Sequence, residues 1–284
     1  MSFLPLYAPE TGSVLLLAGL IGLAIGSFLN VVIARLPKQL AQQWQADCDQ
    51  QPPADPISLA KPASHCPYCK HHIAWYDNIP VLSWVLLRAK CRACGVAISW
   101  RYPGVELLTG VIFATIGWHF GMLQTAPYFY MLGAALLIAL FFIDLDAMLL
   151  PDSLTLSLLW LGLWFSLFSD TVTPRDAIIG ASAGYLSLWT VFWGFKLLTG
   201  RDGMGYGDFK LLAAMGAWLG WQLLPVVVIV AAFSGALIGI IWQLLRPSQR
   251  GAPIPFGPFL IIGGALAWWR GAEWLHSYWY WLQG

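Results

Sequence analysis

Two aspartates that border apolar segments are the residues of this sequence best suited to chemistry. Asp144 directly follows the apolar residues 141–143, and Asp208 ends a G-x-G-D motif at 205–208. An ionisable side chain at membrane depth is costly, so each acid there is a candidate functional residue. Two facing aspartates would share one proton, because like charges in contact resist ionising together. Such a pair can activate a water molecule against a peptide carbonyl and protonate the departing amine.

Gly205 and Gly207 give the second acid its setting, which we interpret as an active-site loop. Glycine permits a positive φ and a close backbone approach, so an extended substrate backbone could lie beside Asp208. Two further acids have simpler roles, since Asp146 is expected to be exposed and Asp152 to cap a following helix. On residue chemistry alone the paired acids could equally be helix caps or headgroup-level charges.

Two C-x-x-C pairs predict a metal site. Their flanks repeat as well, because an isoleucine and a tryptophan follow each pair at equal offsets. Four thiolates at this spacing fit one tetrahedral zinc ion, and a site with four protein ligands is structural because it has no position for water. The alternatives are two disulfides or unliganded thiols. A fifth cysteine, Cys48, is expected to be a free thiol, and the zinc ligands are Cys66, Cys69, Cys91 and Cys94.

The composition requires a lipid environment around these sites. Of 284 residues 58% are hydrophobic and only 10% are charged, against about 25% charged in ordinary soluble domains. The lipid bilayer is therefore the first predicted partner. The net charge is +1 and the chain has no basic tract, so nucleic acid is not expected as a partner.

The apolar runs predict an all-α polytopic membrane protein with about eight transmembrane helices. The first run, at 14–36, is longer than the apolar part of a signal peptide and long enough to span a bilayer. A polar stretch follows it and holds the cysteines, so a small zinc-knuckle domain is inserted after the first helix. The expected helices cover 13–35, 103–122, 126–146, 153–169, 176–198, 209–222, 224–245 and 256–274.

Orientation follows from the lysines and arginines. Thirteen of the 15 fall on one side if the polar stretch is cytoplasmic, as the positive-inside rule requires. This side includes the loops at 144–152 and 199–208, and the N-terminus lies outside. The predicted domains are a first transmembrane helix at 1–35 with a periplasmic N-terminus, a cytoplasmic zinc domain at 36–102 and a membrane domain at 103–284.

The remaining motifs indicate helix packing and no further catalytic site. A G-x-S-x-G match at 180–184 lies inside an apolar segment, whereas a nucleophilic serine needs a strand-to-helix turn. G-x-x-x-G spacings at 22–26 and 216–220 favour close helix packing. The sequence contains no H-E-x-x-H motif.

Taken together, these motifs resemble the type IV prepilin peptidases, which are bifunctional leader peptidases and N-methyltransferases with G-x-G-D-type aspartyl protease sites. The resemblance spans nearly the whole chain. It rests on GSFLNVV at 26–32, the paired C-x-x-C module, ISWRYP at 98–103 with Glu106, Asp144 seven residues before Pro151, GYGDFK at 205–210 and PFGPF at 255–259.

The resemblance also implies catalytic residues, substrates and a second activity, which the residues alone do not establish. It implies that Asp144 and Asp208 are the catalytic pair, that the substrates are prepilins and pseudopilins, and that cleavage occurs at the cytoplasmic face of the bacterial inner membrane. It also implies methylation of the new N-terminus with S-adenosyl-L-methionine, linked to the polar segment and to Gly95. The sequence leaves a homo-oligomer open.

Two other readings remain on the sequence alone. One is a transporter or channel with a zinc-stabilised cytoplasmic domain, whose acids would couple protons or cations. Such proteins often carry repeated halves, which the apolar segments do not show. The other is a membrane aspartyl peptidase with different substrates.

Overall fold

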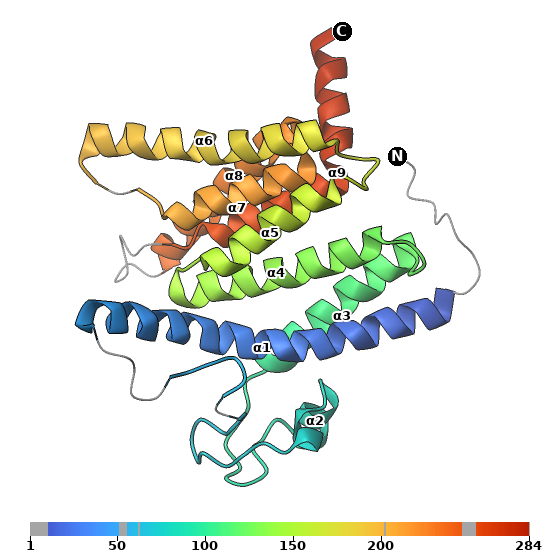
Figure 1. Cartoon of the computed structure of the whole chain (residues 1–284), viewed down its shortest axis with the longest axis vertical. Coiled ribbons are helices and arrows are strands. Elements are labelled where there is room, and N and C mark those ends of the chain that lie inside the picture. Colours follow the sequence, from blue (N-terminus) through green and yellow to red (C-terminus); the bar gives the residue numbers. More distant parts are fainter. Residues whose placement is uncertain (1–10, 51–55, 62, 202, 246–253, 284) are drawn as a thin grey trace. The chain divides into compact units, whose positions relative to one another are not determined.

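The fold is described here from a computed structural model of the 284-residue chain. The structure describes residues 11–50, 56–61, 63–201, 203–245 and 254–283 (Figure 1). The predicted periplasmic N-terminus and two of the counted cations, Arg246 and Arg250, lie outside these residues.

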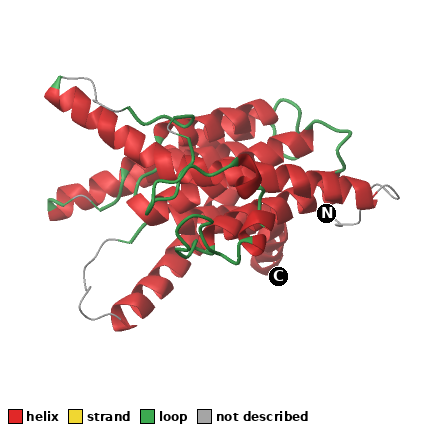
Figure 2. Cartoon of the chain, turned by 90° about the horizontal axis from the view of Figure 1, so that it is seen from below, coloured by secondary structure: helices red, strands yellow, loops and turns green. Residues whose placement is uncertain are grey.

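Helices make up almost all of the regular structure, as predicted (Figures 1 and 2). Three short elements, η1 (Trp75–Asn78), α2 (Leu82–Leu86) and η2 (Trp221–Leu223), accompany the long ones. The long helices are α1 (Thr11–Asp49), α3 (Arg101–Phe120), α4 (Ala126–Ala147), α5 (Asp152–Phe165), α6 (Pro174–Thr199), α7 (Tyr206–Leu219), α8 (Leu224–Leu245) and α9 (Gly257–Gln283).

Each of the eight expected helices is present. Within the described residues, four segments are long and apolar enough to cross a membrane: Gly12–Asp49, Ala126–Ala147, Pro174–Thr199 and Trp221–Leu245. The chain is therefore a polytopic membrane protein, while the number of eight spans remains a prediction. Helix α1 differs most from expectation, since it passes through Pro37 and ends 14 residues beyond the predicted end at 35. The added part is rich in alanine, glutamine and leucine, which favour helix.

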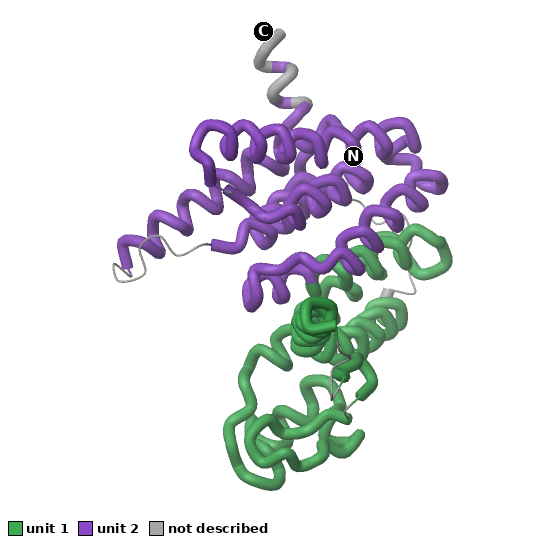
Figure 3. The backbone as a smooth tube through the Cα atoms, turned by 60° about the vertical axis from the view of Figure 1, so that its left-hand side comes forward, with its two compact units in different colours: residues 1–139 green, residues 140–284 purple. Residues whose placement is uncertain are grey.

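The chain divides into two compact units, residues 1–139 and 140–284 (Figure 3). In the first unit, α1 and α3 pack backbone against backbone. A Cβ atom at Gly22 would lie 2.7 Å from the carbonyl oxygen of Thr109, and one at Gly26 would lie 2.7 Å from the Cα of Glu106. The predicted role of this G-x-x-x-G pair in close packing is confirmed.

In the second unit, α7 packs between α5 and α6 and also contacts α9. Gly180 on α6 faces Gly216 on α7, and a Cβ atom on either would overlap the carbonyl group of the other. Ser182, between Gly180 and Gly184, is exposed and donates to the carbonyl oxygen of Ile178 at 2.9 Å. The G-x-S-x-G match is thus a helix-packing motif.

This contact generates a stability prediction. Gly180→Ala should destabilise the second unit by about 1–3 kcal/mol, because the methyl group forces α6 and α7 apart. Gly194 lies on the same helix in open space, so Gly194→Ala is the matched control and should leave stability unchanged or slightly higher. Thermal unfolding in detergent measures both variants. Equal melting temperatures for the two variants would contradict the close α6–α7 contact.

Candidate active site and metal site

Both predicted catalytic aspartates lie at helix ends in the second unit. Asp144 is near the C-terminus of α4, and Asp208 is the third residue of α7. Their side chains are buried, with exposed fractions of 4% and 6%. The carboxylates are close enough to interact electrostatically. The structure therefore brings together the two acids that the family resemblance selects.

A backbone amide at the start of α9 binds the first acid. The amide of Gly257 donates to Oδ2 of Asp144 at 3.0 Å. The first amides of a helix have no partner within the helix, and the positive end of the helix dipole favours a carboxylate. A Cβ atom at Gly257 would lie 2.6 Å from this Oδ2 atom. Only glycine fits at this contact without displacing Asp144.

The G-x-G-D loop uses its glycines for space rather than for unusual backbone angles. Gly205 precedes α7 in extended conformation with φ −81°, and Gly207 is not among the glycines with positive φ. The positive φ that glycine permits is therefore not used in this loop. A Cβ atom at Gly207 would lie 2.7 Å from the Cβ of Leu150. A Cβ atom at Gly205 would have Oδ2 of Asp208 as its nearest neighbour, at 3.8 Å, so this glycine is not required by close packing.

Leu150 joins the segments that hold the two acids. Its buried side chain contacts the position of Gly207 on α7 and lies 3.3 Å from where a Cβ of Gly257 would be. One leucine thereby packs against the N-termini of both α7 and α9. An aromatic cluster of Phe192, Tyr206 and Phe209 fixes the start of α7 from the other side, with ring centroids 5.2–5.6 Å apart.

The neighbouring acids do not belong to this pair. Asp146 is exposed, as predicted. The predicted capping role of Asp152 is wrong, because Pro151 occupies the N-cap position and α5 begins at Asp152. Asp152 instead forms an ion pair with Lys210 of α7, with both carboxylate oxygens 2.6–2.7 Å from Nζ.

The four predicted metal ligands form a cluster in the first unit. Their sulfur atoms all lie within 4.8 Å of one another, and Sγ of Cys66 is 3.9 Å from Sγ of Cys94. Tetrahedral zinc with Zn–S bonds of about 2.3 Å requires sulfur atoms about 3.8 Å apart. Backbone amides of Cys69 and Tyr68 lower the pKa of the Cys66 thiol to about 6, which favours the thiolate form that binds metals. The donor set and spacing fit a zinc ion.

The sequence repeat is also a structural repeat. Each C-x-x-C turn is flanked by one antiparallel bridge, His65 with His72 and Lys90 with Ala97. In each turn the fourth residue after the first cysteine donates its amide to that cysteine's carbonyl, at 3.0 Å and 2.9 Å. These residues are Lys70 in the first turn and Gly95 in the second, and both have positive φ, 59° and 72°.

Gly95, the predicted methyl-donor position, is thus part of the second turn. A Cβ atom there would meet no atom within 4 Å. Since Lys70 adopts the same conformation in the first turn, the turn itself does not demand glycine. The predicted site residues beside Gly95 are the metal ligands of the same turn, Cys91 and Cys94.

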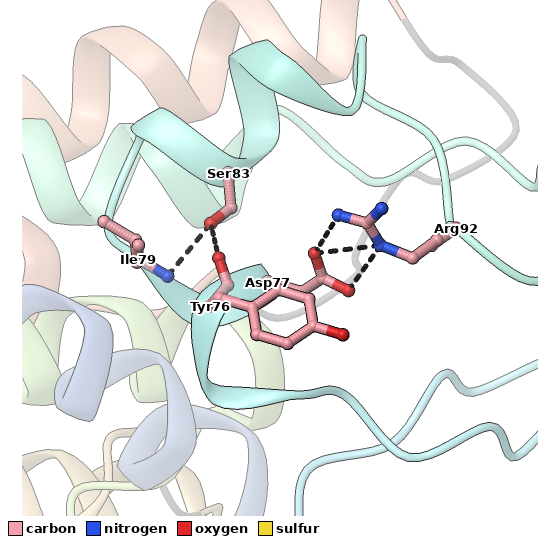
Figure 4. Close-up of polar contacts among 5 residues, drawn as sticks. All are labelled: Tyr76, Asp77, Ile79, Ser83 and Arg92. Carbon is pink, nitrogen blue, oxygen red and sulfur yellow. Dashed lines mark hydrogen bonds and ion pairs between the residues drawn. The ribbon is translucent and has the colours of Figure 1, made fainter.

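The segment between the two turns is tied to the second one (Figure 4). Arg92 forms an ion pair with Asp77 at 2.6 Å and lies over the ring of Tyr76. Hydrogen bonds from the Arg92 guanidinium lower the pKa of Asp77. Ser83 donates to the carbonyl of Tyr76 at 2.9 Å and accepts from the amide of Ile79 at 3.0 Å.

The site thus consists of two buried, neighbouring carboxylates on a scaffold of apolar helices. Comparison with known families identifies the kind of protein that carries it. The Bacterial Peptidase A24 N-terminal domain matches residues 20–120, and the Type IV leader peptidase family matches residues 131–240. The chain belongs to the type IV leader peptidase family, which confirms the resemblance.

Curated relatives support membership of this family over most of the chain. A prepilin leader peptidase/N-methyltransferase of Aeromonas hydrophila is 52% identical over 259 residues, covering 87% of this chain and 88% of that protein. Proteins of the same description from Pectobacterium carotovorum and Pseudomonas aeruginosa are 49% and 48% identical, with 87% of this chain covered in each case and 89% and 87% of those proteins. No solved structure gives a significant match to the chain.

Sequence reasoning missed the residues that hold the acids. Leu150 entered only as part of the loop at 144–152, Gly257 only as a letter of the PFGPF motif, and Glu106 only through the resemblance. Glu106 is buried and accepts the amide of Val81 at 2.7 Å. A signal was available in principle, since a glutamate inside an apolar run is costly unless the protein supplies a partner.

The cysteine cluster generates a prediction for metal content. Cys66→Ser should lower bound zinc from about one ion per chain to almost none, because the four-thiolate site loses one ligand and with it part of the binding energy that folds the segment. Elemental analysis of the purified protein measures this. Cys48→Ser is the matched control, since Cys48 is exposed and outside the cluster. Equal zinc in both variants would overturn the assignment.

Proposed function

We propose that this enzyme cleaves the basic leader from prepilins or pseudopilins with Asp144 and Asp208, at the cytoplasmic face of the bacterial inner membrane, and then N-methylates the new N-terminus. The enzyme class, a prepilin leader peptidase and N-methyltransferase, is that of its curated relatives. The single observation that carries the residue assignment is the pair of buried, interacting aspartates, Asp144 near the end of α4 and Asp208 at the start of α7, with Asp144 bound by the first amide of α9.

The proposed hydrolysis follows from the geometry of this pair. Two neighbouring carboxylates in a buried setting hold one proton between them. The ionised member takes a proton from water as that water attacks the peptide carbonyl. The protonated member donates to the carbonyl oxygen and later assists the departing amine. The Gly257 amide holds Asp144 in place. The substrate backbone would approach Asp208 past Gly205, which carries no side chain.

The proposed methyl transfer belongs to the other unit. S-adenosyl-L-methionine, when bound, would supply the methyl group to the new N-terminal amine. The cysteine cluster orders the two turns, and Gly95 lies exposed in the second one. The absence of a side chain at Gly95 is the feature that supports a role in donor binding, because the turn itself accepts lysine.

The transporter or channel reading has less support. It explains buried acids but not the match of both halves of the chain to a peptidase family.

The catalytic pair is tested by isosteric substitution. Asp144→Asn and Asp208→Asn should each reduce prepilin cleavage by about 10²- to 10⁴-fold, because neither variant can share a proton as the pair does. Cleavage of purified prepilin by the purified enzyme in detergent measures this. Asp146→Asn is the matched control, since Asp146 is close in sequence but exposed. Full cleavage by either catalytic variant would contradict the assignment. An equal loss of cleavage in the Asp146→Asn control would also contradict it.

The methyl-donor position is tested by exchanging the residues of the two cysteine turns. Gly95→Lys should keep the turn, the zinc and cleavage, yet lower methyl transfer to a pre-cleaved pilin by about 100-fold through displacement of the donor. Lys70→Gly is the reciprocal control and should keep all three properties. Transfer of a radiolabelled methyl group and zinc content are the measurements. Undiminished transfer by Gly95→Lys would remove Gly95 from the site.

A further inference from the structure

The short helix α2 has an uncovered apolar face within the polar segment. Leu82, Val85 and Leu86 share this face by helical spacing, with exposed fractions of 50%, 56% and 71%. The opposite face is engaged, since Ser83 is buried and the indole of Trp84 donates to the carbonyl of Ile98 at 3.1 Å. Exposing apolar side chains of this size to water is unfavourable relative to burying them.

The depth of α2 follows from α1 and α3. Gly26 on α1 lies against Glu106 on α3, deep inside the apolar part of α1. Arg35 is the first cation of the chain and marks the edge of that apolar part. Ser27 precedes Arg35 by eight residues, which places it about 12 Å deeper along a helix rising 1.5 Å per residue.

A polar contact fixes the start of α2 at this depth. Glu106 accepts the amide of Val81, the residue before α2, at 2.7 Å and also bonds with the side chain of Ser27. Val81 has φ 60°, an unusual conformation for a β-branched residue. The segment is thus held against the apolar part of α1 and α3 at the cost of a strained backbone.

We propose that α2 lies in the cytoplasmic interface of the bilayer and anchors the zinc module to lipid. Leu82, Val85 and Leu86 enter the acyl region at the depth set by Glu106. Arg88 and Lys90, exposed just beyond the helix, face anionic headgroups. The zinc module is then partly embedded in the membrane surface instead of free in the cytoplasm.

The charge pattern favours lipid over a protein partner. An apolar face followed by exposed cations is typical of segments that lie in a membrane interface. Trp100, directly before α3, is 76% exposed, as is typical of tryptophan at the membrane–water boundary.

The test is a depth measurement in the full-length, zinc-loaded protein in lipid nanodiscs of phosphatidylethanolamine and phosphatidylglycerol. A fluorescent amino acid replaces Leu86, or in a second protein Val85. Quenching is measured with nitroxide-labelled lipids and with aqueous iodide. Leu20 on the spanning part of α1 and Trp44 on its extension serve as matched references, since each is 55% exposed. Trp44 lies nine residues beyond Arg35, about 13 Å farther from the membrane.

The lipid nitroxides should quench probes at 85 and 86 as strongly as the probe at 20, and aqueous iodide should quench them little. A probe at 44 should respond to iodide alone. Iodide quenching at 85 and 86 equal to that at 44 would overturn the proposal. So would protection from iodide that arises only when prepilin is added, because the face would then be a substrate-docking surface. Neither result bears on the aspartate pair, whose cleavage assay is independent of this measurement.

Discussion

A carboxylate buried in a membrane protein must find its hydrogen-bond donors within the protein, and this constraint organises both units. In the second unit, Asp144 is satisfied by the amide of Gly257, the first residue of α9. In the first, Glu106 is satisfied by the amide of Val81 just before α2 and by Ser27 on α1. In each case the donor is a backbone amide at the beginning of a helix, where helical bonding leaves it free. Burying the acid therefore also fixes where a helix begins.

A contact between a carboxylate and a backbone amide needs space around the amide, and glycine provides this space. A methyl group at Gly257 would collide with the carboxylate that its amide binds, and one at Gly207 would collide with Leu150. Leu150 packs against both helix starts, so the position of one acid depends on the segment that holds the other. Close packing transmits such a dependence because a protein interior resists small displacements. The positions of the two acids therefore depend on the end of α4, the starts of α7 and α9, and the packing of Leu150.

The sequence predicts the helices far better than it predicts the contacts among them. Runs of apolar residues fix the position of each helix, and the doubled cysteine spacing leads directly to the metal cluster. The role of Asp152 is mispredicted because its partner, Lys210, lies 58 residues away and no local pattern reveals it. The choice of Asp144 as partner of Asp208 has the same difficulty, since the predicted orientation puts several acids on one side of the membrane. Only the family resemblance selects it, and the extension of α1 beyond Pro37 shows that a proline is an unreliable helix end.

The two proposed activities have different physical requirements, and the two units meet them separately. Four thiolates would complete a tetrahedral zinc site and leave no position for water, so a zinc ion there would not supply the nucleophile for hydrolysis. Its contribution would be to fold a segment too small for its own core. The proposed hydrolysis therefore assigns the chemistry to the aspartates, which need burial and a shared proton but no metal. Methyl transfer needs an unhindered approach to a bound donor, and the proposal assigns this approach to Gly95, whose position has no protein atom within 4 Å of an added Cβ. A defect in either unit should therefore impair one reaction while the chemistry of the other persists.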